Sequence, residues 1–183
     1  MLRKGSMGEA TEYFLNAGMR NILLDGDVYQ VPNMDWTKLS ALQVGRYAEY
    51  FAKMEFASYG LEVYTTEVDD HGVDFIVKDK QGRFCEVQVK SVRGMGYIFT
   101  SKSKFDISNQ NLYLTVLVFE NGKLPHIFLI PSETWRTPND VFVDRNYDRP
   151  EQKSQPEYGI NLSKRNYGAL DPFRFDSVIT KFL

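Results

Sequence analysis

Three polar side chains alternate with apolar ones in the segment GRFCEVQVKS, residues 82–91: Glu86, Gln88 and Lys90. Residues two apart on a β-strand point to the same face, so these three side chains would lie in a row. A carboxylate and an amide offer hard oxygen ligands suited to Mg²⁺ or Mn²⁺, and a nearby ammonium could orient a water molecule or neutralise phosphate charge. The set suits phosphodiester hydrolysis, although a solvated outer face of the sheet would give the same pattern.

Asp74 joins this row in only one of two hairpin registers. Residues 72–91 read as two strands joined by a turn at DKQG. A two-residue turn at Lys80–Gln81 would make Asp74 face away from the row. A three-residue loop that also includes Gly82 would place Asp74 opposite Gln88. We expect this second register because such loops favour a left-handed residue, typically glycine, at the last position.

A helix and further strands must position this hairpin. SALQ at residues 40–43 fits a capping box, apolar residues follow at helical spacing, and Gly60 suits a helix end, so we expect a helix over about 41–59. The run 112–120 is apolar at nearly every position, which is typical of a strand buried on both faces. Further strands are expected at 61–68, 72–79, 83–91 and 124–130, and a helical turn at PSETW. This order indicates an α/β fold in which helices pack on a mixed sheet.

The length of 183 residues suits one domain with terminal extensions. We expect an N-terminal extension over 1–39, a core over 40–136 and a C-terminal tail over 137–183 that packs on the core. The 22 basic and 24 acidic residues give a net charge of −2. This balance is not typical of a general nucleic-acid binder, but it is compatible with a basic groove on an otherwise acidic surface.

The remaining composition excludes two kinds of stabilising site. The single cysteine, Cys85, rules out an internal disulfide framework, and with only two histidines a structural zinc site is essentially excluded. No run reaches the roughly 18 apolar residues of a membrane span, and the first residues lack the apolar core of a signal peptide. We therefore expect a soluble, cytoplasmic protein without membrane contact.

The motif order resembles that of the PD-(D/E)XK nucleases, which include many restriction endonucleases, Holliday-junction resolvases and repair nucleases. The match consists of Asp74 in GVDF, then Gln88-Val89-Lys90 in EVQVKS, after the helix GRYAEYFAKMEFASYG, over roughly residues 41–135. It implies a restriction endonuclease-like core with the order α-β-β-β-α-β. It also implies Mg²⁺ or Mn²⁺ as cofactor, DNA as partner and, since such nucleases often dimerise, a homodimer.

One position departs from the family pattern. The second acid of the motif is Gln88 here, and Glu86 on the same face could supply the missing charge as a metal ligand beside Asp74 and Gln88. Glu86 could equally be an outer-face residue, which would leave a weaker metal site. Two functions therefore stay open: a metal-dependent nuclease acting on DNA, with Lys90 positioning the water, or a catalytically inactive nuclease-fold domain that binds nucleic acid or a protein. A structural α/β protein with a charged edge strand is the third reading.

Residues outside the hairpin could assist the site. By the resemblance, Glu49 matches the helix carboxylate that some members use, while Glu55 lies closer to the centre of the apolar stripe and is its rival. Three basic residues, Arg93, Lys102 and Lys104, could contact phosphates, which is where most nucleic-acid affinity originates. The same residues could instead belong to a polar surface loop.

Overall fold

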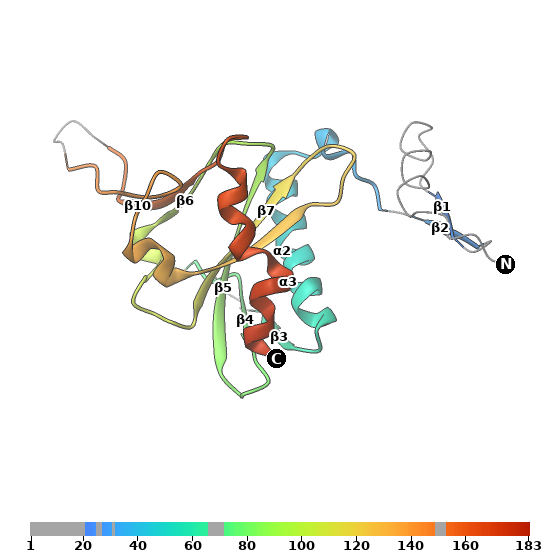
Figure 1. Cartoon of the computed structure of the whole chain (residues 1–183), viewed down its shortest axis with the longest axis horizontal. Helices are drawn as coiled ribbons and strands as arrows, with labels where there is room; N and C mark the ends of the chain where they lie inside the picture. The colour runs from blue at the N-terminus through green and yellow to red at the C-terminus, as the bar shows by residue number, and fades with distance from the viewer. Residues whose placement is uncertain (1–20, 25–26, 31, 66–71, 149–152) are drawn as a thin grey trace.

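The computed structural model describes residues 21–24, 27–30, 32–65, 72–148 and 153–183. The strands of this part form three sheets (Figure 1). The large sheet has the order β3-β4-β5-β7-β8, and its only parallel pair is β5 with β7. Its strands are β3 (Glu62–Thr65), β4 (Phe75–Lys78), β5 (Phe84–Arg93), β7 (Leu112–Phe119) and β8 (His126–Pro131).

Two smaller antiparallel sheets complete the strand set. The order β6-β10-β9 joins β6 (Tyr97–Ser101), β10 (Glu157–Asn161) and β9 (Phe142–Arg145), whereas β1 (Asn21–Leu24) pairs with β2 (Asp27–Gln30). The helical elements are α2 (Ala41–Ser58), α3 (Phe175–Val178) and the 3₁₀ segments η1 (Trp36–Lys38), η2 (Lys102–Lys104), η3 (Ser132–Arg136), η4 (Tyr167–Phe173) and η5 (Ile179–Phe182).

Helix α2 begins and ends where the sequence predicts. The Ser40 hydroxyl accepts a hydrogen bond from the backbone N–H of Gln43 at 3.2 Å, and the Gln43 side chain accepts one from the backbone N–H of Ser40 at 2.8 Å. This reciprocal pair satisfies two backbone donors that the first helical turn leaves free. Gly60, with φ of +73°, follows the helix end in the left-handed conformation that glycine adopts at low cost.

The β4–β5 hairpin has the three-residue register. Phe75 pairs with Val87 and Ile76 with Glu86, so the loop comprises residues 80–82. Gly82 has φ of +82°, and its N–H donates to the Asp79 carbonyl at 3.1 Å. The expected left-handed glycine and the three-residue register are therefore confirmed for the paired residues of β4. Asp74 lies just before them, and its N–H bonds to the Val87 carbonyl.

The large sheet separates two hydrophobic cores. Helix α2 packs on one face through Val44, Ala48, Ala52 and Phe56, together with C-terminal residues of α3 and η5. The three-stranded β6-β10-β9 sheet covers the other face. Strand β7 contributes Leu117 to the first core and Leu114 to the second, which confirms burial on both faces.

Cys85 lies in the first core. Burial raises the pKa of its thiol to about 11, which keeps the thiol protonated at neutral pH. The side chain is therefore a packing residue, as its place on the apolar side of the strand predicts.

The helix, the antiparallel strands β3 to β5 and the parallel strand β7 confirm the expected α/β, restriction endonuclease-like class. One element differs from the expected order. Among the described residues, the connection from β5 to β7 contains β6 and the short 3₁₀ segment η2 rather than an α-helix. None of the described helices has the length and hydropathy that a membrane crossing requires.

Candidate nuclease site

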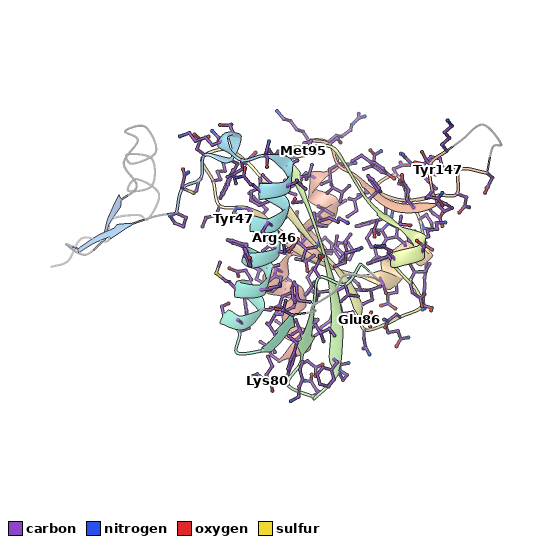
Figure 2. All side chains as sticks on the ribbon, turned by 180° about the vertical axis from the view of Figure 1, so that it is seen from behind. Arg46, Tyr47, Lys80, Glu86, Met95 and Tyr147 are labelled. Carbon is purple, nitrogen blue, oxygen red and sulfur yellow. The ribbon has the colours of Figure 1, made fainter. Side chains whose placement is uncertain are left out.

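The candidate site lies where β5 extends past the first residue of β4, while β5 stays paired with β7 on its other side. The backbone N–H of Asp74 donates to the Val87 carbonyl at 2.9 Å, but the N–H of Val89 on β5 donates to a side chain instead of to backbone. The Asp74 Oδ2 accepts a hydrogen bond from the Val89 N–H at 2.6 Å. The carboxylate thus lies along β5 between the levels of Gln88 and Lys90. In Figure 2, β5 can be followed from the turn beside Lys80, past Glu86, towards Met95.

Gln88 is the most buried polar member of the row, with 3% of its surface exposed. The Thr100 hydroxyl on β6 donates a hydrogen bond to Gln88 Oε1. On the other side, Gly72 approaches the amide so closely that a Cβ on this glycine would lie 2.6 Å from Gln88 Nε2. The Gln88 amide is therefore in contact with Thr100 of β6 on one side and with Gly72, which precedes Asp74, on the other.

Two lysines extend this arrangement. Lys90 is partly buried on the same strand face as Gln88, and it makes no hydrogen bond or ion pair with any described residue. Lys104 is exposed, and a Cβ added to Gly72 would lie 3.0 Å from the Cβ of Lys104. The structure therefore brings Lys104, which follows β6 in the chain, beside the same glycine that contacts Gln88.

Glu86 lies apart from the Asp74 carboxylate. It shares the strand face of Gln88, but the Asp74 carboxylate is at the level of Val89, which is about 10 Å further along an extended strand. The Glu86 carboxylate instead accepts a hydrogen bond from Asn109 Nδ2 at 3.2 Å. The two carboxylates are consequently not gathered around one point.

The two helix carboxylates lie on different sides of α2. Lys53, one helical turn after Glu49, has its ammonium 5.7 Å from the Phe75 ring centre, so this side of the helix faces the start of β4. Glu49 itself pairs with Arg46 at 2.6 Å. Glu55 lines a hollow with His126 of β8, at the opposite edge of the large sheet. Of the two rivals, Glu49 is the one on the side of Asp74.

The two other basic residues are already engaged. Arg93 donates to the Leu39 carbonyl, and its position on β5 directs it to the face opposite Gln88. Lys102 forms an ion pair with Asp144, and its ammonium lies 4.8 Å from the Tyr158 ring centre. Only Lys104 of the three expected phosphate contacts lies next to the row.

The donor set can be compared with the needs of a divalent cation. The described residues contain no group of three His, Cys, Asp or Glu side chains placed to hold a metal. Asp74 and Gln88 supply one carboxylate and one amide at adjacent positions. Mg²⁺ suits such a set because it retains several waters and takes only one or two carboxylates.

Sequence reasoning missed Thr100. It lies in YIFTS, where Tyr97, Phe99 and Ser101 alternate with Ile98 and the threonine. This alternation is the strand signal that could have revealed an inward-facing threonine. Its contact with Gln88 depends on how two sheets pack, which no local pattern encodes.

Comparisons with known proteins give likenesses in structure only. No protein-family model and no curated protein matches the sequence. The chain is similar to the bacterial homing endonuclease I-Ssp6803I, with a TM-score of 0.48 and 16% identity over 78% of this chain and 94% of that chain. It is also similar to Hjc, a Holliday junction resolvase of Archaeoglobus fulgidus, with a TM-score of 0.47 and 12% identity over 76% of this chain and 98% of that chain. The order of its own helix and strands is a mixed α/β arrangement that matches a restriction endonuclease-like fold.

Proposed function

We propose that this protein is a metal-dependent nuclease that hydrolyses phosphodiester bonds in DNA. The observation that carries the proposal is the ammonium of Lys90. The Lys90 side chain is partly buried, it has no hydrogen-bond or ion-pair partner among the described residues, and it shares a strand face with Gln88, one residue beyond the Val89 N–H that binds the Asp74 carboxylate. A cation that forms no ion pair with a described residue is available to a phosphate group.

Asp74 and Gln88 would hold the Mg²⁺ or Mn²⁺ ion. Thr100 now donates to the Gln88 oxygen, but a hydroxyl can also accept. A half-turn of the amide would therefore keep this contact and present the oxygen towards Gly72. The bound ion would lower the pKa of its water and screen the charge that develops on the phosphate.

The chain's own residues have distinct tasks in this proposal. Lys90 orients the attacking water and neutralises charge on the phosphate that is cleaved. Lys104, exposed beside Gly72, contacts a neighbouring phosphate. Glu49 would assist Asp74 from the side of α2 that faces β4, although α2 packs on the sheet face opposite Gln88. Glu86 lies too far along β5 to share an ion with Asp74 unless the side chains move.

The test is Mn²⁺-dependent cleavage of plasmid and of single-stranded DNA by the wild type and by Lys90→Ala. We expect the variant to fold normally and to lose about 100-fold or more in rate, the usual cost of removing one charge-stabilising group. Lys123→Ala is the matched control, because Lys123 lies in the distant β7–β8 turn and pairs only with Glu120 on the surface. Full activity in Lys90→Ala would refute the assignment.

A catalytically inactive nuclease-fold domain that binds nucleic acid is the second candidate. It is favoured by Gln88, an uncharged group that already has a hydrogen-bond partner in Thr100. Gln88→Glu distinguishes the two readings. If the site is a functional metal site, the new carboxylate should tighten Mn²⁺ binding, measured by calorimetry, and wild type should bind Mn²⁺ measurably. Absence of Mn²⁺ binding and of cleavage in the wild type would favour the inactive domain.

A further inference from the structure

The outer face of the β6-β10-β9 sheet carries an aromatic pair. Because strand residues alternate, Ile98 and Thr100 of β6 face the interior while Tyr97 and Phe99 face outward. The two outward rings are nearly parallel, with an interplanar angle of 16° and centres 6.1 Å apart. Phe99 has 56% of its surface exposed, so a large apolar ring lies open to solvent on a strand.

Tyr97 is held rigidly beneath this surface. It crosses Gly159 of β10 so closely that a Cβ on the glycine would lie 2.1 Å from the Tyr97 hydroxyl oxygen. That hydroxyl donates to the buried Glu157 carboxylate at 2.7 Å. The guanidinium of Arg145 lies 4.2 Å from the ring centre. Contacts with Gly159, Glu157 and Arg145 thus fix the ring of Tyr97 against the sheet.

The ring of Phe99 borders an open hollow. The hollow is lined by Phe99, Ser101, Ser154, Gln155 and Glu157. A flat ligand stacked on the exposed Phe99 ring would lie near the Arg145 guanidinium, because the Tyr97 ring that the guanidinium covers is centred 6.1 Å from that of Phe99. Such a ligand would meet an aromatic face below it, hydroxyl and amide groups at its edge and a cation beside it.

We propose that this surface, defined by Tyr97, Phe99, Arg145 and Gln155, binds an unpaired nucleobase of a nucleic-acid strand. The inference rests on the proposed function, because the nucleic-acid strand bound here is the same strand that enters the candidate nuclease site. A nucleotide combines a flat ring for Phe99, polar edges for Gln155 and an anionic phosphate, which would compete for the Arg145 guanidinium with the Glu157 carboxylate 3.8 Å away. Strand β6 contributes to both sites: Phe99 lies on the outer face of the small sheet, and the next residue, Thr100, lies on its inner face and contacts Gln88.

The first test measures binding without cleavage. The dissociation constant of labelled oligothymidylate is determined by fluorescence anisotropy in EDTA, for the wild type and Phe99→Ala. We expect the variant to bind about 5- to 100-fold more weakly, the range found for loss of one base–aromatic stack. Phe84→Ala is the matched control, since Phe84 is 55% exposed and also pairs with a neighbouring ring, that of Tyr64, but lies at the β4–β5 hairpin. Equal binding by wild type and Phe99→Ala, or an equal loss in Phe84→Ala, would overturn the proposal.

The second test places a reporter on the surface. Both natural tryptophans, Trp36 and Trp135, are buried, so the emission of Phe99→Trp adds an exposed signal. Stacked bases should quench this emission, and an abasic oligonucleotide of the same length should not. Quenching of equal size with the abasic strand would contradict base stacking. Since neither test requires a metal, tight oligothymidylate binding without cleavage would defeat the nuclease proposal alone, and cleavage of duplex without oligothymidylate binding would defeat the base site alone.

Discussion

At Gly72 the backbone itself comes close enough to shape the candidate site. The residue has φ of +77°, in the left-handed region, and a Cβ there would meet Gln88 Nε2 at 2.6 Å and the Lys104 Cβ at 3.0 Å. Real Cβ atoms do not approach other heavy atoms to 2.6 Å, so any other residue would displace the amide or its own backbone. The glycine is therefore required for two reasons, conformation and space.

Two glycine variants separate these reasons. Gly82→Ala in the hairpin turn, with φ of +82° and open space around it, should lose only about 1–2 kcal/mol of unfolding free energy from left-handed strain. Gly72→Ala should lose more, and it should also reduce Mn²⁺-dependent cleavage about 100-fold because the Gln88 amide moves. Denaturant unfolding and cleavage rates check both effects. Equal activity in the two variants would mean that the approach to Gln88 does not matter.

The individual site residues differ in how far the sequence alone could place them. Alternation along β5 and the glycine of its turn predicted the hairpin register, in which Gln88 and Lys90 share a strand face and the Asp74 carboxylate accepts from the intervening Val89 N–H. The separation of Glu86 from Asp74 was not foreseen, because sharing a strand face says nothing about distance along it. The ion pair that engages Lys102 joins β9 to the end of β6, and such long-range partners leave no local signal.

Among the elements, the β4–β5 hairpin decides which side chains reach the site. A slip of one residue in its register would turn every side chain of one arm to the opposite face. Asp79 secures the turn: its carboxylate accepts from the N–H groups of Gln81 at 2.9 Å and Arg83 at 2.7 Å, and from Arg83 Nε at 2.6 Å. Burial raises the pKa of this carboxyl, but the hydrogen bonds and charge of Arg83 outweigh burial, and the pKa lies below its ordinary value.

This pKa gives a pH dependence with a definite sign. A lowered folded-state pKa stabilises the protein above the unfolded value of about 3.9, and the contribution disappears as the pH falls further. Asp79→Asn should therefore cost about 1–3 kcal/mol at pH 7, and the difference from wild type should shrink below pH 4. Urea unfolding across this pH range provides the measurement. Tyr64 and Lys78 also lower the pKa of Glu62, but this carboxylate is exposed and solvent screens it, so Glu62→Gln should show a much smaller pH-dependent loss.

Elements with strong local signals were predictable, and those defined by distant pairing were not. The capping box at Ser40 predicts a helix start, and the apolar run of β7 predicts a buried strand, each from a few neighbouring residues. Strands β6, β9 and β10 are only four or five residues long and pair with segments far away in sequence. They lie in stretches whose Gly, Pro and polar content is typical of loops, so the sequence alone did not predict the β6-β10-β9 sheet.

Across the whole molecule, the C-terminal residues close the first core. The ring centre of Phe182 lies 5.8 Å from that of Phe56 on α2 and 5.0 Å from that of Tyr113 on β7. The Phe182 carbonyl also accepts a hydrogen bond from the N–H of Lys80 in the hairpin turn, at 2.9 Å. The end of the chain therefore supports both the helix and the hairpin that positions the site.

Two adjacent positions test this closure. Phe182→Ala should lower the free energy of unfolding by about 3–5 kcal/mol, because it leaves a cavity among fully buried rings. Leu183→Ala, at an exposed neighbouring position, should change it by no more than about 0.5 kcal/mol. Chemical denaturation of both variants gives the comparison. A similar small effect for both would show that the core does not depend on the chain end.

The hydrogen bond between Asp74 and Val89 has a consequence for how this protein could change over evolutionary time. Without that carboxylate the Val89 N–H would lose its partner beyond the first residue of β4, at a cost of about 1–3 kcal/mol. A descendant that no longer needed chemistry would still be under selection to keep Asp74 in order to fold. Lys90 makes no such bond with the described residues, so nothing but function would preserve it. Among relatives, the presence of the lysine rather than of the aspartate should distinguish catalytically active proteins from inactive ones.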